Sequence, residues 1–178
     1  KEFPFYDKIQ EIRKNEEWLN QVGWLKDSTQ ASLELYNPVV MSKMFMLNDA
    51  AIYNHFNTEH LLWVDGAITS TVHPGYFTHD KVFEKIHPYI NKFLFLCFPY
   101  DVDSPEIHGF ERSAITEFSK TDSIEYVARA GMFGGTKESI HKANSIYYAL
   151  LNQTLERGYM GTEESIFTIM SYLHPDIF

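Results

Sequence analysis

Three short apolar runs separate the helix-forming segments of this chain, and this alternation constrains the fold more than any other feature. The runs cover residues 61–64, 92–98 and 124–130. The composition of the first two favours buried strands, and the third alternates enough to be a strand. Helices that alternate with such strands are typical of an α/β sandwich with a largely parallel sheet. The sequence therefore predicts an α/β fold, with helices flanking the sheet.

Local signals place helices around these strands. Thr136 is a suitable N-cap for a long helix, Gly158 can stop that helix, and Thr162 can cap a final one. The glycines within residues 131–135 are expected to break the third strand. The predicted helices cover residues 5–25, 39–56, 78–87, 136–157 and 162–174.

The length of 178 residues predicts a single domain over residues 1–178. The chain opens on a predicted helix, whereas a nucleotide-binding α/β domain usually begins with a strand. We therefore expect a fragment of such a domain that lacks an N-terminal strand.

Charge and hydropathy narrow the choice of partners and location. The net charge is −9, which disfavours general binding to nucleic-acid backbones. No apolar run approaches the ~20 residues needed to span a bilayer, so we expect no membrane span. No signal peptide is visible, and we expect a cytoplasmic protein.

Asp65 stands at the end of the first apolar run and is followed by Gly66. A carboxylate at the end of a buried strand can hold Mg²⁺ or Mn²⁺ against a diphosphate, because these ions favour oxygen ligands and bridge to substrate phosphates. The alternative is an aspartate that caps a turn before a glycine.

Asp101 and Asp103 form a second candidate metal site after the second apolar run. Carboxylates two residues apart point to the same side of an extended chain, so they could clamp a metal ion. They could equally belong to a solvated acidic turn. A metal ion clamped by the two carboxylates would suit a metal-dependent phosphoester or pyrophosphate hydrolase.

Two further segments could contribute to a site. Residues 131–135 contain glycines that permit a close approach to a ligand, but they match no phosphate-binding fingerprint and could be a plain turn. Glu163 and Glu164 begin the final predicted helix, where the helix dipole stabilises acids without any function. One of them could also serve as a general base or accept a hydrogen bond from a sugar hydroxyl.

Four segments in order resemble the YibB/HtrL-like proteins. They are residues 35–43 (LYNPVVMSK), 62–68 (LWVDGAI), 131–135 (GMFGG) and 161–164 (GTEE). The resemblance extends over about residues 18–178, and its first two segments are the specific ones. These proteins look like GT-A-fold glycosyltransferases of the nucleotide-diphospho-sugar transferase superfamily. The resemblance implies a GT-A-like, Rossmann-type mixed sheet that binds a nucleotide sugar.

The resemblance also implies roles for individual residues. Lys43 matches a basic position before the metal-binding strand, and Asp65 matches the first aspartate of a D-x-D motif. Ala67 occupies the position of the second aspartate, which leaves metal binding to Asp65 and another acid. Glu163 or Glu164 matches a late acidic position near the acceptor and would be catalytic. The implied nucleotide-sugar site comprises Lys43, Asp65, Gly66, Ala67, Gly134 and Gly135.

These implications lead to an expected function. We expect a glycosyltransferase that uses Mn²⁺ or Mg²⁺ and moves a sugar from a nucleotide-sugar donor to a glycan or polysaccharide acceptor. Two alternatives stay open: the metal-dependent hydrolase described above, and a degenerate, non-catalytic domain that binds glycans. The alanine at position 67 favours the second alternative.

Overall fold

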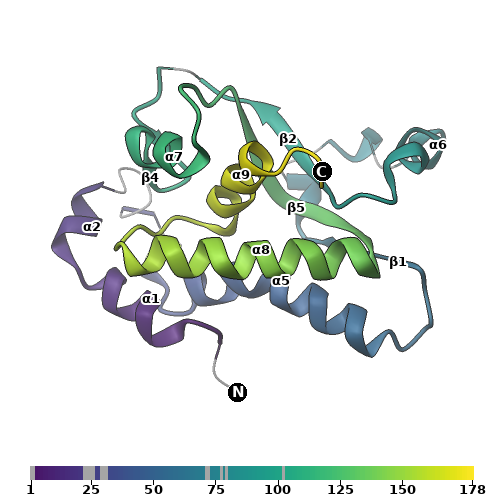
Figure 1. The fold of residues 1–178 in the computed structure, drawn as a ribbon, viewed down its shortest axis with the longest axis horizontal. Helices are drawn as coiled ribbons and strands as arrows, with labels where there is room; N and C mark the ends of the chain where they lie inside the picture. The colour runs from purple at the N-terminus through teal and green to yellow at the C-terminus, as the bar shows by residue number, and fades with distance from the viewer. Residues whose placement is uncertain are drawn as a thin grey trace.

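The computed structural model shows a mixed α/β protein (Figure 1). It describes residues 3–21, 27–28, 32–70, 73–76, 78, 80–101 and 103–178. The α-helices in these residues are α1 (Tyr6–Arg13), α2 (Glu16–Gln21), α5 (Tyr36–Tyr53), α6 (Val82–Ile86), α7 (Arg112–Ser119), α8 (Lys137–Glu156) and α9 (Glu163–Leu173). Short 3₁₀ turns lie at η1 (Ile68–Ser70), η2 (Pro74–Tyr76) and η3 (His87–Tyr89).

The main sheet has three strands, β1 (His60–Val64), β2 (Leu94–Pro99) and β5 (Tyr126–Thr136), in the order β1-β5-β2. Both neighbouring pairs are antiparallel. The largely parallel sheet predicted from the sequence is therefore wrong for the described strands. Alternation of helices and strands is a local pattern, and it leaves open which strands pair and in which direction.

The third predicted strand does not end at its glycines. β5 continues through residues 131–135 as the central strand of the sheet. Gly134 has a φ of 150°, and a Cβ there would lie 2.2 Å from the Leu61 carbonyl oxygen. Glycine is thus required because β1 packs against the backbone of β5 at this point.

A short hairpin formed by β3 (Glu106–Ile107) and β4 (Phe110–Glu111) precedes α7. Neither the hairpin nor α7 was predicted. Two-residue strands have too few residues to show an alternating pattern, so their pairing depends on contacts elsewhere in the chain.

The two C-terminal helices begin as predicted. The Thr136 hydroxyl accepts a hydrogen bond from the Ser139 N–H at 3.1 Å, which caps α8. Ser165 Oγ accepts a hydrogen bond from the Thr162 N–H at 3.1 Å at the start of α9. Gly158, with a φ of 79°, follows the end of α8. These caps form within one turn of helix, and sequence signals predict such local contacts well.

Other helix boundaries differ from the prediction. The helix expected over residues 5–25 divides into α1 and α2, and residues 22–25 lie outside the described part of the chain. α5 begins three residues earlier than predicted and ends at Tyr53. Of the helix expected over residues 78–87, the described residues are α-helical only in the five residues of α6, and residue 79 lies outside the described part of the chain.

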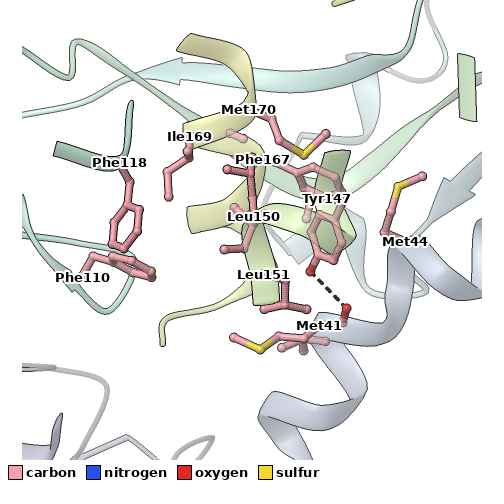
Figure 2. Close-up of a cluster of buried hydrophobic side chains, with 14 of the residues drawn as sticks. Met41, Met44, Phe110, Phe118, Tyr147, Leu150, Leu151, Phe167, Ile169 and Met170 are labelled. Atoms are coloured by element: carbon pink, nitrogen blue, oxygen red, sulfur yellow. Dashed lines mark hydrogen bonds between the residues drawn. The ribbon is translucent and has the colours of Figure 1, made fainter. Parts of the chain in front are cut away.

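The core lies between the sheet and helices α5, α8 and α9 (Figure 1). Phe133 of β5 and Phe95 of β2 pack against Phe167 of α9. In Figure 2, the Tyr147 hydroxyl of α8 donates to the Met41 carbonyl of α5 at 3.0 Å, which ties the two helices together. None of the described helices combines the length and the apolar character that a bilayer crossing requires.

Candidate functional site

Lys43 of α5 forms ion pairs with carboxylates from two other parts of the chain. Its Nζ donates to Asp65 Oδ2 at 2.9 Å and to Glu163 Oε1 at 2.7 Å. Asp65 follows β1, and Glu163 is the first residue of α9. These three residues, the Lys43 cluster, join the helix layer to one end of the sheet.

Asp65 is held at the carboxyl end of β1, as predicted. Its N–H donates to the Gly131 carbonyl of β5 at 2.9 Å. Trp63 lies two residues earlier, on the same face of the strand, and its Nε1 donates to Asp65 Oδ1 at 2.7 Å. The Trp63 ring stacks on Phe133 in the sheet. The orientation of this carboxylate is therefore fixed by the strand that carries it.

The three side chains of the Lys43 cluster are buried to different depths. The side-chain exposure is 34% for Asp65, 12% for Lys43 and 6% for Glu163. Asp65 is therefore the member that an incoming ligand meets first. Glu163 is the least exposed of the three.

Burial raises the pKa of Glu163 to about 7, although Lys43 opposes this shift. Burial also acts to lower the pKa of Lys43, but the two carboxylates outweigh it and the pKa is raised. At neutral pH, Lys43 is therefore charged, and the pKa of about 7 leaves Glu163 partly protonated.

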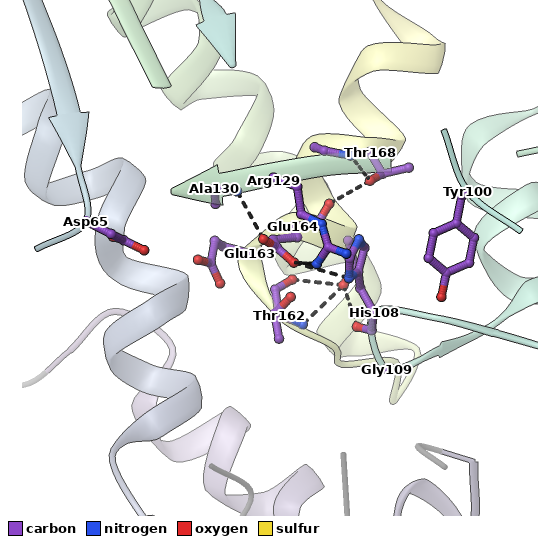
Figure 3. Close-up of polar contacts among 12 residues, drawn as sticks. Asp65, Tyr100, His108, Gly109, Arg129, Ala130, Thr162, Glu163, Glu164 and Thr168 are labelled. Carbon is purple, nitrogen blue, oxygen red and sulfur yellow. Dashed lines mark hydrogen bonds and ion pairs between the residues drawn. The ribbon is translucent and has the colours of Figure 1, made fainter. Parts of the chain in front are cut away.

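Glu164 points away from the Lys43 cluster, as Figure 3 shows. Its Oε1 accepts from the Ala130 N–H at 3.1 Å, and its Oε2 accepts from Arg129 Nη1 at 3.3 Å. The His108 Nδ1 lies 3.2 Å from the same Oε2. Adjacent helical residues diverge by about 100°, so only one of the two glutamates can face Asp65. The structure assigns that position to Glu163.

His108 and Arg129 are parts of this arrangement that the sequence did not reveal. His108 lies in the turn of the β3–β4 hairpin, and burial lowers its pKa to about 3, so the ring is neutral. Its carbonyl oxygen accepts hydrogen bonds from the Thr162 N–H at 3.3 Å and from the Ser165 hydroxyl at 2.9 Å. The unpredicted hairpin thus fixes the first turn of α9, which carries Glu163.

The first turn of α5 also adjoins this site. The Asn37 side chain donates to the Gly161 carbonyl at 3.0 Å, just before α9 begins. Burial raises the pKa of Tyr36 to about 12, and the negative charges of Glu163 and Glu164 add to the effect. Tyr36 lies seven positions before Lys43 and therefore on the same face of α5. Helical spacing could thus have identified Tyr36 as a residue near the Lys43 cluster.

The other residues assigned by resemblance have different surroundings. Gly66 and Ala67 are exposed, and the Ala67 carbonyl accepts from the Ser70 N–H at 2.9 Å in a turn after Asp65. Gly134 and Gly135 are buried in β5. A Cβ at Gly135 would lie 2.3 Å from the Lys92 carbonyl, so packing of the sheet accounts for this glycine.

Asp101 and Asp103 form a turn after β2. Asp101 Oδ1 accepts a hydrogen bond from the Asp103 N–H at 3.0 Å, and the Asp101 carbonyl accepts from Arg112 Nη2. Val102 lies outside the described residues. Across the part of the chain that the structure describes, no group of three or more His, Cys, Asp or Glu side chains is arranged to hold a metal ion.

Comparison with known proteins identifies a family. No curated protein and no solved structure matches the chain. The model of a family described as "Bacterial protein of unknown function (HtrL_YibB)" matches residues 5–178. This match covers nearly the whole sequence and confirms the family resemblance predicted from its motifs. The chain belongs to the HtrL_YibB family.

Proposed function

We propose that this protein is a GT-A-like glycosyltransferase that moves a sugar from a nucleotide-sugar donor to a glycan acceptor. The observation that carries the proposal is the Lys43 cluster. Lys43, Asp65 and one of Glu163 and Glu164 were assigned to one site by resemblance alone. Hydrogen bonds now join them, although Lys43 and Glu163 are 120 positions apart in the sequence.

Charge balance supports a divalent cation in this site. The single positive charge of Lys43 faces two carboxylates, so the cluster has no spare positive charge for a diphosphate. Each oxygen of Asp65 accepts one hydrogen bond and keeps a further lone pair, and the side chain is one-third exposed. Asp65 therefore fits as one ligand of Mn²⁺ or Mg²⁺, whose remaining ligands would be waters and donor phosphates. Such an ion would neutralise charge on the leaving diphosphate.

Glu163 is the proposed general base. A base works best when its pKa lies near the operating pH, and the pKa of Glu163 is about 7. In this role, Glu163 takes the proton of the acceptor hydroxyl, and Lys43 stabilises the charges around it. Glu164 already contacts Arg129, Ala130 and His108, so we propose that it positions α9.

One observation favours the degenerate, glycan-binding alternative. Both oxygens of Asp65 already accept hydrogen bonds from side chains of this chain, and Ala67 supplies no second carboxylate. A binding domain could keep this arrangement for its stability alone. The hydrolase alternative has less support, because Asp101 and Asp103 stabilise their own turn. Cytoplasmic location and the lack of nucleic-acid partners stay predictions.

Thermal-shift screening of UDP- and GDP-sugars, with and without Mn²⁺, tests donor binding, because a ligand of the native state raises the melting temperature. We expect a shift that requires Mn²⁺ and is lost in Asp65→Asn, which keeps the size of the side chain but loses its charge. Asp101→Asn is the matched control and should keep the shift. A larger loss in Asp101→Asn would move the metal site to the turn after β2.

Turnover with a sugar acceptor tests the catalytic assignment. Glu163→Gln should still bind donor and should lose about 10²–10⁴-fold in rate. Glu138→Gln is the matched control, since Glu138 is an exposed glutamate in the first turn of α8. Donor binding without transfer or hydrolysis in the unmodified protein would favour the degenerate domain. Hydrolysis of phosphoesters that depends on Asp101 would favour the hydrolase.

A further inference from the structure

Arg129 is a part-exposed cation beside the Lys43 cluster. It lies on β5 two residues before Gly131, so the two Cα atoms are about 7 Å apart along the strand. The Gly131 carbonyl in turn accepts from the Asp65 N–H at 2.9 Å. The side chain of Arg129 is 39% exposed, compared with 12% for Lys43. Arg129 is therefore the cation that a ligand of this site reaches more easily.

The guanidinium of Arg129 has hydrogen-bonding capacity to spare. In the part of the chain that the structure describes, it forms one hydrogen bond, from Nη1 to Glu164 Oε2 at 3.3 Å. Charge-assisted hydrogen bonds are ordinarily ~2.7–2.9 Å long, so Glu164 holds the guanidinium loosely. The remaining N–H donors of a guanidinium form a planar fork that matches a carboxylate or a phosphate group.

Glu164 does not depend on Arg129 for its position. The Ala130 N–H donates to Glu164 Oε1 at 3.1 Å, and His108 Nδ1 lies 3.2 Å from Oε2. The neutral His108 ring donates its Nδ1 proton to this carboxylate, because a carboxylate oxygen can only accept. Arg129 can therefore turn its fork toward a ligand while Glu164 keeps two other partners.

Arg129 and Asp65 lie on opposite sides of Glu163, as Figure 3 shows. In the proposed reaction, the donor diphosphate lies at Asp65. The acceptor oxygen bonds to the anomeric carbon while the bond from that carbon to the diphosphate oxygen breaks. The hydroxyl proton passes to Glu163, and the bonding electron pair leaves with the diphosphate. Acceptor and leaving group stand at opposite ends of this displacement, so the acceptor lies on the side of Arg129.

We propose that Arg129 binds a carboxylate or phosphate group of the acceptor, so that the acceptor is an acidic glycan. The proposal rests on the proposed function, which defines the donor side at Asp65 and the base at Glu163. The guanidinium would form a bidentate pair with the acidic group, while Glu164 keeps its contacts with Ala130 and His108. A neutral glycan would leave the fork of Arg129 to water.

Direct binding of three methyl glycosides tests this proposal without donor or turnover. Methyl β-glucuronoside carries a carboxylate, methyl β-glucoside 6-phosphate carries a phosphate, and methyl β-glucoside is neutral. We expect one acidic glycoside to bind about tenfold more tightly than the neutral one, because hydrogen bonds to charged groups are the stronger ones. Titration followed by NMR measures the three affinities, and the tighter acidic glycoside identifies the group. Equal affinities for all three would overturn the proposal.

Arg129→Gln should lose the preference for the acidic glycoside and keep its affinity for methyl β-glucoside. Arg129→Lys keeps the charge without the fork and should keep part of the preference. Arg157→Gln is the matched control, because Arg157 is 41% exposed and pairs with Glu117 at 2.9 Å. An unchanged preference in Arg129→Gln would overturn the proposal. Weaker UDP binding in Arg129→Gln, with unchanged glycoside affinities, would assign Arg129 to the donor phosphates and would also overturn it.

The two proposals fail in different ways. A preference for acidic glycosides that requires Arg129, without transfer from any nucleotide sugar, would support the acid-binding role of Arg129 and overturn the transferase. Transfer to acidic and neutral glycosides with equal KM values would support the transferase and overturn the role of Arg129.

Discussion

At the residue scale, the carboxyl group of Glu163 is buried against Lys43, and its pKa of about 7 lies above the ordinary 4.5. The folded protein therefore binds this proton more tightly than the unfolded chain does. The resulting stabilisation is full below pH 4.5 and is lost as the pH rises through 7. The size of the effect is on the order of 3 kcal/mol.

Glu163→Gln removes this titrating group and tests its effect on stability. The quantity to compare is the unfolding free energy of the unmodified protein minus that of the variant. We expect this difference to fall by roughly 2 kcal/mol between pH 5 and pH 8. Urea denaturation at four pH values measures it. Parallel pH profiles would show that Glu163 has an ordinary pKa in the folded state.

Lys43 is the only positive charge bonded to both Asp65 and Glu163 in the described structure. Lys43→Met should lower the unfolding free energy by about 3 kcal/mol at pH 7.5, because a partly buried carboxylate pair loses its counter-ion. Urea denaturation measures the loss. Lys8→Met is the control, since Lys8 pairs with Glu11 on the surface and should matter little.

The double variant Lys43→Met/Glu163→Gln tests whether that loss comes from uncompensated charge. It should be more stable than Lys43→Met alone, since the most buried carboxylate is then neutral. If the double variant instead loses as much unfolding free energy as the two single variants together, the effect of Lys43→Met comes from lost packing of the lysine stem.

At the element scale, the central strand β5 requires glycine where β1 crosses it closely. Gly134→Ala should lower the unfolding free energy by about 2–4 kcal/mol, because its Cβ would collide with the Leu61 and Leu62 backbone and φ is 150°. Chemical denaturation measures this. Gly66→Ala is the control: none of the described atoms lies within 4 Å of its added Cβ, and the change should stay within ~1 kcal/mol. Equal effects would contradict the close approach of the two strands.

At the scale of the whole molecule, residues from both ends of the described chain share one core. Ile9 of α1 and Ile177 belong to the same buried cluster, and Trp18 Nε1 of α2 donates to the Met160 carbonyl at 2.7 Å. We therefore expect one cooperative unfolding transition for residues 1–178.

Tryptophan fluorescence and far-UV circular dichroism should give coincident denaturation curves. Trp18→Phe should shift both curves together by about 1–2 kcal/mol, because it leaves the buried Met160 carbonyl without its donor. A separate early transition seen only by fluorescence would show that α1 and α2 unfold independently of the sheet.

Much of the local structure followed from the sequence. Thr136 and Thr162 mark the starts of α8 and α9, and Asp65 directly follows β1, because caps and strand ends depend on neighbours within a few residues. Motif resemblance also selected Lys43, Asp65 and the pair Glu163 and Glu164, and in the structure Lys43 contacts Asp65 and Glu163.

The tertiary structure alone decided the features that depend on distant partners. The antiparallel order β1-β5-β2, with β5 continuing through its glycines, arises from pairing between strands separated along the chain. The choice of Glu163 over Glu164 depends on the rotation of α9, which the His108 hairpin fixes. Sequence patterns report the preferences of neighbouring residues, whereas register, strand direction and the rotation of a helix are settled by packing across the whole core.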